Sequence, residues 1–149
     1  QQWLVLAAAV FLLAAFVLPG IDVRLGWSRV HPLVSLSAVV VVGFSYAFYF
    51  LVLKTNSYAA RTVKTEEQQT LATSGPYALV RHPMYLAFIL MYVFSPLALG
   101  SWWGILPTLL LPPVMAGRIL NEEQILQREL KGYTEYMQKT KYRLFPGLW

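Results

Sequence analysis

Four apolar stretches without a charged residue alternate with polar segments along the first 117 residues of the chain. They cover residues 3–19, 32–53, 84–99 and 102–117. A helix rises about 1.5 Å per residue and the hydrocarbon core of a bilayer is about 30 Å thick, so one crossing needs roughly 20 residues. The second stretch reaches this length by itself. The pattern predicts an all-α, polytopic integral membrane protein with about four transmembrane helices in one domain, 1–149.

The stretch 3–19 also has the length of the apolar core of a signal peptide. It lacks a basic flank and a small-residue cleavage site, so we expect a membrane span that ends at Pro19 and Gly20. The last two stretches meet at Gly100 and Ser101 and are short. We expect them to form a tight helical hairpin that either crosses a thin part of the bilayer or does not cross it fully. Four prolines should bend this hairpin: Pro96, Pro107, Pro112 and Pro113.

The polar tail that follows, 118–149, is predicted to begin as a helix that leaves the membrane. Apolar side chains recur at nearly the helical period from Asn121 to about Lys139. Gly132 is a weak point in this pattern. The stripe indicates a cytoplasmic C-terminal helix that packs on the protein or lies at the membrane interface.

Charge fixes the expected orientation. If all four stretches cross, the loop 54–83 and the tail 118–149 share one side with the N-terminus. The opposite side carries only Arg24 and Arg29 among the lysines and arginines. The shared side carries ten: Lys54, Arg61, Lys64, Arg81, Arg118, Arg128, Lys131, Lys139, Lys141 and Arg143. Because basic residues concentrate on the cytoplasmic side of membrane proteins, we expect the loop and the tail to be cytoplasmic.

Composition narrows the function classes. The chain is 57% hydrophobic and 13% charged, with a mean hydropathy of +0.51 and a net charge of +5. The basic residues flank apolar segments rather than forming a soluble patch, so a nucleic-acid partner is not expected. The chain has no cysteine, which excludes disulfides and thiolate metal sites, and we predict no metal site of another kind.

Two polar clusters lie at the two ends of the expected hairpin. Arg81 and His82 precede it, and Arg118 and Glu122 follow it, about 36 residues later. A hairpin starts and ends on the same side, so the clusters should meet, and the i,i+4 spacing puts Arg118 and Glu122 on one helical face. Pro83 suits a first helical turn, which places His82 near the N-cap, where an anion is favoured. His82 can move a proton near neutral pH, and Arg81 can hold a carboxylate in a forked geometry.

A plainer interpretation exists for each cluster. Arg81 could be a headgroup anchor and His82 a helix cap, while Arg118 and Glu122 could form an ordinary helix ion pair, which is worth little at an exposed surface. Against this, Arg118, Glu122 and Glu123 follow directly on an apolar stretch, where charged side chains are costly and are usually paired or functional.

Three sequence blocks together resemble the isoprenylcysteine carboxyl methyltransferase family and its bacterial relatives. They are TSGPYALVRHPMYLAF (73–88), RILNEEQ (118–124) and KGYTEYMQKTKYRLFPGLW (131–149). The likeness covers about 69–146, and the first two spans match only in character. The wider superfamily also contains phospholipid methyltransferases and some sterol reductases, so the fold does not fix the substrate.

The resemblance implies S-adenosylmethionine as the cofactor. The positions that match cofactor contacts are Gln69, Thr70, Leu71, Ala72, Tyr77, His82, Pro83, Met84, Tyr85 and Glu122. Arg118 matches an arginine assigned to the substrate, and with His82 and Arg81 it makes up the expected catalytic set. Gln69 departs from the histidine of the eukaryotic enzymes. Independently, the sequence has no glycine-rich strand–turn–helix motif, so a Rossmann-type methyltransferase is excluded.

The resulting expectation is an S-adenosylmethionine-dependent methyltransferase in the bacterial inner membrane, with membrane lipids around it and a lipophilic or lipidated acceptor. A carboxylate acceptor is the first choice, and a phospholipid, amine or thiol acceptor is the alternative. An NADPH-dependent reductase of the same superfamily would need a longer chain with more spans. A non-catalytic membrane or lipid-binding subunit would show the same hydropathy without a need for the two clusters.

Overall fold

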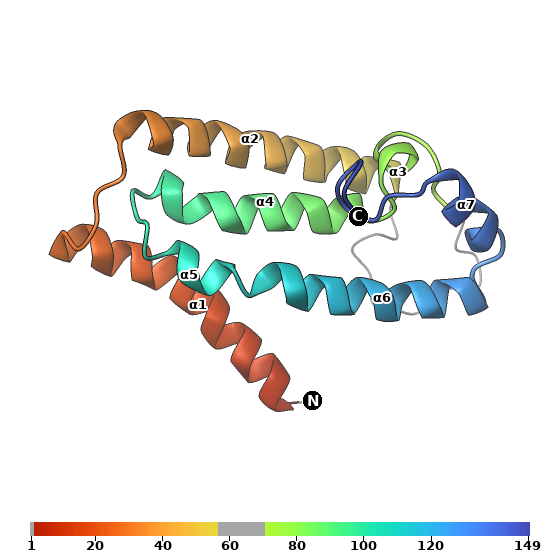
Figure 1. Ribbon diagram of the computed structural model, residues 1–149, viewed down its shortest axis with the longest axis horizontal. Helices are drawn as coiled ribbons and strands as arrows, with labels where there is room; N and C mark the ends of the chain where they lie inside the picture. The colour runs from red at the N-terminus through yellow and green to blue at the C-terminus, as the bar shows by residue number, and fades with distance from the viewer. Residues whose placement is uncertain (1, 57–70) are drawn as a thin grey trace. The chain divides into compact units, whose positions relative to one another are not determined.

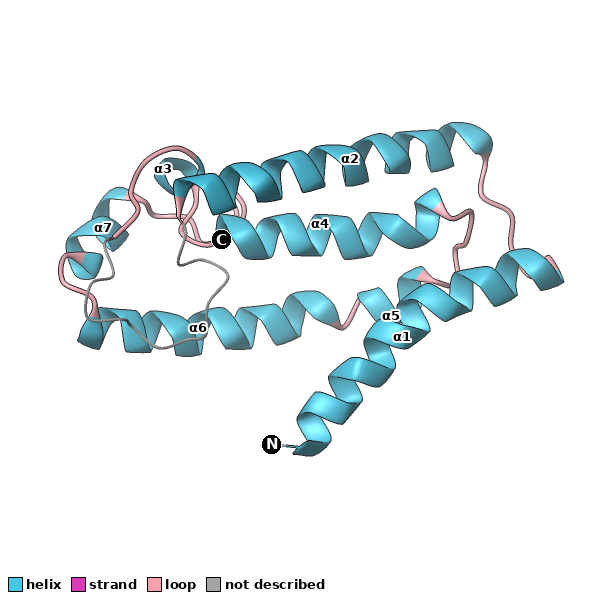
Figure 2. Ribbon diagram, turned by 180° about the vertical axis from the view of Figure 1, so that it is seen from behind, coloured by secondary structure: helices cyan, strands magenta, loops and turns pink. Residues whose placement is uncertain are grey.

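The structure, a computed structural model, describes residues 2–56 and 71–149, with side chains from residue 13 onward. The described chain is helical and contains no strand, which confirms the all-α prediction for these residues (Figures 1 and 2). Its helices are α1 (Gln2–Leu25), α2 (Pro32–Thr55), α3 (Pro76–Leu79), α4 (Pro83–Ala98), α5 (Ile105–Thr108), α6 (Leu111–Glu129) and α7 (Tyr133–Lys139).

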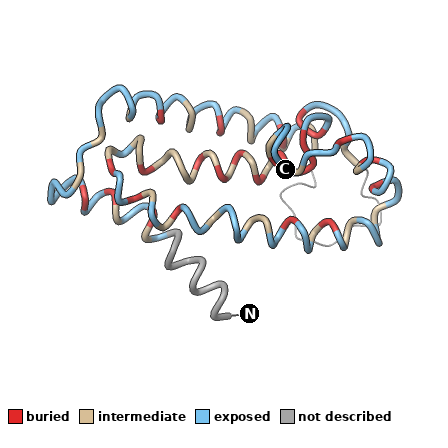
Figure 3. Tube along the Cα trace, viewed as in Figure 1, coloured by how far each residue is buried: buried red, intermediate tan, exposed pale blue. Residues whose placement is uncertain are grey.

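Helix α2 matches the predicted span 32–53 closely. Among the described residues it is the helix that is both long and apolar enough to cross a membrane, and α4 is apolar but shorter. Only 17% of the most apolar 18-residue stretch of α2 is buried inside the protein, and Figure 3 shows exposed positions along most of the helix. Bilayer hydrocarbon would cover such a surface, so α2 supports a membrane location. The crossings predicted for 3–19, 84–99 and 102–117 stay predictions.

Helix α1 does not end at Pro19 and Gly20 as predicted. It continues with Pro19 inside it and ends at Leu25. A proline removes a single N–H donor, and a helix that gains packing elsewhere tolerates this loss. The helix stops at Gly26, which has a φ of +67°. This left-handed conformation ends helices and favours glycine.

Close contacts divide the chain into two compact units: Gln1–Tyr46 with Ile89–Pro112, and Ala47–Phe88 with Pro113–Trp149. In the first unit the carboxylate of Asp22 is fully buried. It accepts hydrogen bonds from the backbone N–H of Ser28 at 2.7 Å, from the hydroxyl of Ser28 at 2.6 Å and from the hydroxyl of Ser101. These bonds tie the end of α1 to the segment after α4.

The segment around Gly104 fits tightly against two prolines of the same unit. A Cβ atom at Gly104 would lie 2.6 Å from Cγ of Pro19 and 2.7 Å from Cβ of Pro96. Such distances do not occur in real structures, so glycine is required for α5 to pack this closely. Gly104 also donates its N–H to the Ser101 hydroxyl at 2.9 Å, which links this contact to Asp22.

The sequence predicted one bent helix over 102–117 for the fourth apolar stretch, and the structure differs from this. The stretch forms the short α5 and then the first turns of α6, which runs without a break to Glu129. Pro112 and Pro113 explain the interruption, because each lacks an N–H and its ring would clash with the carbonyl group four residues earlier in a continuous helix. Both fit the first turn of a new helix, which begins at Leu111.

The predicted weak point of the tail is confirmed. Gly132 has a φ of +85° and separates α6 from α7. The second unit therefore contains two helices of the tail, α6 and α7, where the sequence suggested one interrupted stripe. Its buried core is built from one valine and three tyrosines: Val52, Tyr77, Tyr133 and Tyr136. Apolar side chains from five segments pack against this core: Phe48, Leu71, Ala72, Met84, Leu126, Leu130 and Met137.

Candidate functional site

The N-terminal end of α4 positions the first predicted cluster. Pro83 is the first residue of the helix and is fully buried, as its missing N–H allows, and Arg81 and His82 come directly before it. The C-terminal segment holds both in place. The backbone N–H of Arg81 donates to the carbonyl oxygen of Tyr142, and that of His82 donates to the carbonyl oxygen of Arg143, each at 2.9 Å.

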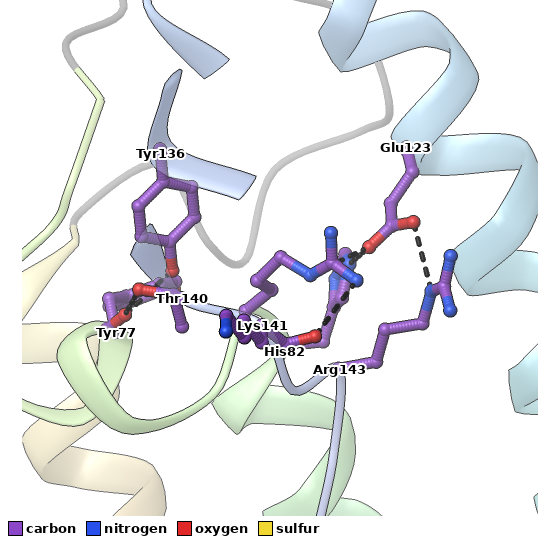
Figure 4. A network of polar contacts seen from close by, with 8 residues as sticks. Tyr77, His82, Glu123, Tyr136, Thr140, Lys141 and Arg143 are labelled. Atoms are coloured by element: carbon purple, nitrogen blue, oxygen red, sulfur yellow. Dashed lines mark hydrogen bonds and ion pairs between the residues drawn. The ribbon is translucent and has the colours of Figure 1, made fainter. Parts of the chain in front are cut away.

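Glu123 on α6 is the partner of this cluster. Its Oε1 lies 3.2 Å from Nε of Arg81 and 3.3 Å from Nε2 of His82. Its Oε2 accepts a hydrogen bond of 2.9 Å from Nε of Arg143. Figure 4 shows Glu123 between His82 and Arg143. The side chains of Arg81, His82 and Glu123 are each no more than 5% exposed, so this ion cluster is shielded from water.

The cluster carries an excess of positive charge, because two arginines face one carboxylate. Burial by itself would raise the pKa of Glu123, but the hydrogen bonds from His82 and Arg143 and the charge of Arg81 outweigh it and hold this pKa below its usual value. Glu123 is therefore ionised at neutral pH. A buried charge of this kind is stable only while its partners remain.

Arg143 is itself held by the end of the chain. Its guanidinium carbon lies 5.2 Å from the ring centroid of Trp149, which is within cation–π range. The backbone N–H groups of Arg143, Leu144 and Phe145 all donate to the carbonyl oxygen of Trp149, at 2.9–3.2 Å. Successive N–H groups that converge on one oxygen fix the backbone of this loop. The loop thereby presents Arg143 to Glu123.

The second predicted cluster meets α4 at Tyr85. The hydroxyl of Tyr85 donates to Oε2 of Glu122 at 2.6 Å and accepts a hydrogen bond of 2.8 Å from Nε of Arg118. Tyr85 is buried, Glu122 is half-buried and Arg118 is exposed. The bond to Tyr85 raises the pKa of Arg118, which keeps its guanidinium charged. The Tyr85 hydroxyl thus bridges Glu122 and Arg118, which lie four residues apart on α6.

Tyr77 connects the short α3 to the core of the same unit. Its hydroxyl accepts a hydrogen bond of 3.2 Å from the Asn56 side chain, and its carbonyl oxygen accepts one of 2.7 Å from the hydroxyl of Tyr136. Burial raises the pKa of the Tyr77 hydroxyl, the bond from Asn56 opposes this, and the charge of Glu122 raises it further. Tyr77 and Glu122 therefore influence each other electrostatically.

The structure brings most of the predicted residues into one unit. The proximity expected between the clusters is confirmed, through Tyr85 for Arg118 and Glu122, and through Glu123 for Arg81 and His82. Four predicted contacts belong to the core or pack against it: Leu71, Ala72, Tyr77 and Met84. Gln69 and Thr70 lie outside the described residues.

Three residues at this site have no assigned role in the sequence analysis. Glu123 is named there only as a neighbour of Glu122, and Arg143 and Tyr133 only as parts of the tail. One helical position separates the two glutamates, so the helical period alone does not tell which of them faces Arg81. The role of Arg143 depends on the loop closed at Trp149, which no sequence signal predicts.

The family model described as phospholipid methyltransferase matches residues 33–131, about two thirds of the chain. The chain belongs to the phospholipid methyltransferase family. The match begins in α2 and includes both polar clusters, and it ends before the Tyr133 helix. A search of curated proteins found no match. Membership in this family implies methyltransferase activity at a membrane, in agreement with the apolar helix α2.

S-adenosylmethionine is the methyl donor that family membership implies. The residues of the second unit fit such a molecule chemically. Glu122 offers a half-buried carboxylate to hydroxyl or ammonium groups. In the described chain, the buried hydroxyl of Tyr133 has no hydrogen-bond partner, whereas the buried Nε of Arg81 makes no hydrogen bond but lies in the ion pair with Glu123. Buried polar atoms of this kind are uncommon and often belong to binding sites.

Proposed function

We propose that this family member is an S-adenosylmethionine-dependent methyltransferase that acts at the cytoplasmic face of the membrane. Its acceptor is a lipophilic molecule with a carboxylate group, as in isoprenylcysteine carboxyl methylation. The protein lies in the bacterial inner membrane, with the loop 54–83 and the tail 118–149 in the cytoplasm. The ten-to-two distribution of basic residues supports this orientation.

One observation carries the proposal. The hydroxyl of Tyr85 joins Glu122, the proposed cofactor ligand, to Arg118, the proposed acceptor ligand, within a chain that belongs to a methyltransferase family. Methyl transfer from a sulfonium is an in-line displacement, so the protein must mainly align donor and acceptor. A side chain that fixes both ligands relative to each other suits this task.

When bound, S-adenosylmethionine supplies a methyl group on a positively charged sulfur. An ionised carboxylate acceptor would take this methyl group as an ester and would need no general base, because it carries no proton that must be removed. Arg118 would orient that carboxylate with its guanidinium group. Glu122 would bind the ribose or the amino-acid portion of the cofactor, and Tyr85 would hold both side chains in register.

The family description favours a second candidate, a phospholipid headgroup amine as the acceptor. An ammonium group must lose a proton before it accepts a methyl group, so a base is needed. His82 is the candidate base, and its ring centroid lies 5.8 Å from that of Tyr85. Its Nε2 already faces Glu123, and this bond occupies one of its two ring nitrogens. Because His82 is already engaged in this way, we favour a carboxylate acceptor, which needs no base, over an amine acceptor.

Transfer of a labelled methyl group to defined acceptors tests the proposal. The purified protein would be supplied with a farnesylated cysteine carboxylate or with phosphatidylethanolamine vesicles. We expect label in the first acceptor as a methyl ester, which alkali releases as methanol. Alkali-stable label in the phospholipid would instead support the amine acceptor. No transfer to either, together with a melting shift by NADPH but not by S-adenosylhomocysteine, would contradict the methyltransferase assignment.

A further inference from the structure

Tyr133, the first residue of α7, has a buried hydroxyl group without a partner. Its side chain is 3% exposed, and its hydroxyl makes no hydrogen bond within the described chain. Buried hydroxyl groups are nearly always paired, because leaving one unpaired costs free energy. The position therefore calls for an explanation other than packing.

Tyr136, three residues later on the same helix, shows what a structural tyrosine looks like in this core. Its ring lies 5.8 Å from that of Tyr133, and its hydroxyl donates a hydrogen bond of 2.7 Å to the carbonyl oxygen of Tyr77. Both side chains are buried in the same core. The fold provides an acceptor for one of the two hydroxyls and none, among the described residues, for the other.

The surroundings of the Tyr133 hydroxyl are charged. Burial raises its pKa, the charge of Glu123 raises the pKa further, and the charge of Arg81 opposes this. The hydroxyl therefore stays protonated and is available as a donor at neutral pH. The ion cluster around Glu123 holds two arginines for one carboxylate. A hydroxyl donor that interacts electrostatically with this cluster suits an anionic acceptor.

We propose that Tyr133 is a binding residue whose hydroxyl donates a hydrogen bond to the carboxylate of the methionine portion of S-adenosylmethionine. The inference rests on the proposed function, in which this cofactor binds in the second unit. The carboxylate is the anionic group of the cofactor, whereas the adenine and the ribose are neutral. Arg81, whose buried guanidinium belongs to the same ion cluster, would supply positive charge to the same group.

Leu71 is a neighbour of Tyr133 in this core. It packs against the core that contains Tyr133, and its Cδ2 would lie 3.8 Å from a Cβ atom at Gly132. It is only half-buried. Because the hydroxyl is covered, binding requires a side chain such as Leu71 to move aside.

Tyr133→Phe tests the inference in the full-length protein in detergent, with Tyr136→Phe as the matched control. Calorimetry would measure the affinity for S-adenosylhomocysteine and for 5′-methylthioadenosine, which lacks the amino-acid portion. For Tyr133→Phe we expect affinity for the first ligand to fall about tenfold and affinity for the second to stay unchanged. Without ligand, the unfolding midpoint of this variant should be equal to or above that of the unsubstituted protein.

Tyr136→Phe should show the reverse pattern, a lower unfolding midpoint with little change in affinity for either ligand. Equal S-adenosylhomocysteine affinity for Tyr133→Phe and the unsubstituted protein would overturn the role of Tyr133 and leave the proposed function intact. An equal loss for both ligands would overturn the carboxylate as its partner. A lower midpoint for Tyr133→Phe would show that its hydroxyl is structural. Absence of binding by the unsubstituted protein would overturn this inference and the proposed function together.

Discussion

The hydroxyl of Tyr85 lies 2.6 Å from Oε2 of Glu122, to which it donates a hydrogen bond. The same hydroxyl accepts a hydrogen bond from Arg118, so a buried residue on α4 fixes two side chains one turn apart on α6. Alignment of donor and acceptor to within about 1 Å decides the rate of a displacement. The positions of both proposed ligands therefore depend on one phenolic oxygen.

Tyr85→Phe should lower the turnover of methyl transfer about 10- to 100-fold. A hydrogen bond to a charged group contributes about 1.5–3 kcal/mol, and the phenylalanine keeps the packing of the ring. Affinity for S-adenosylhomocysteine should fall less than turnover, because Glu122 itself remains. Tyr92→Phe, on the same helix, is the control, and steady-state kinetics provide the measurement. Turnover within twofold of the unsubstituted protein would refute the positioning role of Tyr85.

Arg118→Ala should retain most of the cofactor affinity and lose turnover. The guanidinium is exposed beyond its bond to Tyr85, so its removal leaves the buried core intact. Arg128→Ala removes an exposed charge from the same helix and should leave both quantities unchanged. Calorimetry and labelled-methyl transfer, measured on the same preparations, separate binding from turnover. Normal turnover in Arg118→Ala would exclude a role in orienting the acceptor.

Glu123 should make stability depend on pH in the acidic range. The pKa of Glu123 is lowered in the folded protein. Its contribution to the free energy of unfolding is therefore fully present above the pKa of an unfolded glutamate, about 4.3, and is lost as the pH falls through the lower pKa of the folded protein. Glu123→Gln should lower the free energy of unfolding at pH 7 by about 3–5 kcal/mol, since it leaves buried cations with a neutral partner. The variant should also flatten the acid limb of the stability curve.

Glu135→Gln is the control for that experiment, because Glu135 is an exposed carboxylate on α7. It should change the stability at pH 7 by less than about 0.5 kcal/mol. Unfolding by denaturant in detergent, followed at several pH values, gives the comparison. If both variants showed the same acid limb as the unsubstituted protein, the ion cluster would not be a determinant of acid stability.

Asp22→Ala should destabilise the first unit without affecting ligand affinity. The substitution leaves the N–H and hydroxyl of Ser28 and the hydroxyl of Ser101 without their acceptor, which lowers the free energy of unfolding. All partners of Asp22 belong to the first unit. We expect a lower unfolding midpoint, partly restored in Asp22→Asn, with unchanged affinity for S-adenosylhomocysteine. A variant that folded normally but lost this affinity would place Asp22 in the binding machinery.

Strong local signals made part of this fold predictable. An uncharged run of membrane length predicted α2 nearly to the residue, Pro83 marked the first turn of α4, and Gly132 marked the break before α7. Each of these rests on a property of the residue itself, such as chain length, a fixed φ or access to positive φ. Such properties act whatever the surroundings.

Features that depend on tertiary contacts were not predictable in this way. Helix α1 continues past Pro19, in a unit where Asp22 and Ser101 hold the following turn. At the site, the sequence predicted that the two clusters lie close together. It did not predict that Arg81 pairs with Glu123 rather than with Glu122. That choice depends on the rotation of α6 about its axis, which packing determines.

Calorimetric titration of S-adenosylhomocysteine into purified protein is the most direct test of the proposed cofactor site. The titration would compare the unsubstituted protein with Glu122→Gln, which keeps an acceptor for Tyr85 but removes the charge, and with Gln124→Ala, an exposed neighbour on α6. The account predicts saturable one-to-one binding with equal affinity for the unsubstituted protein and Gln124→Ala, and none measurable for Glu122→Gln. Unchanged affinity in Glu122→Gln, or no binding by the unsubstituted protein, would contradict it.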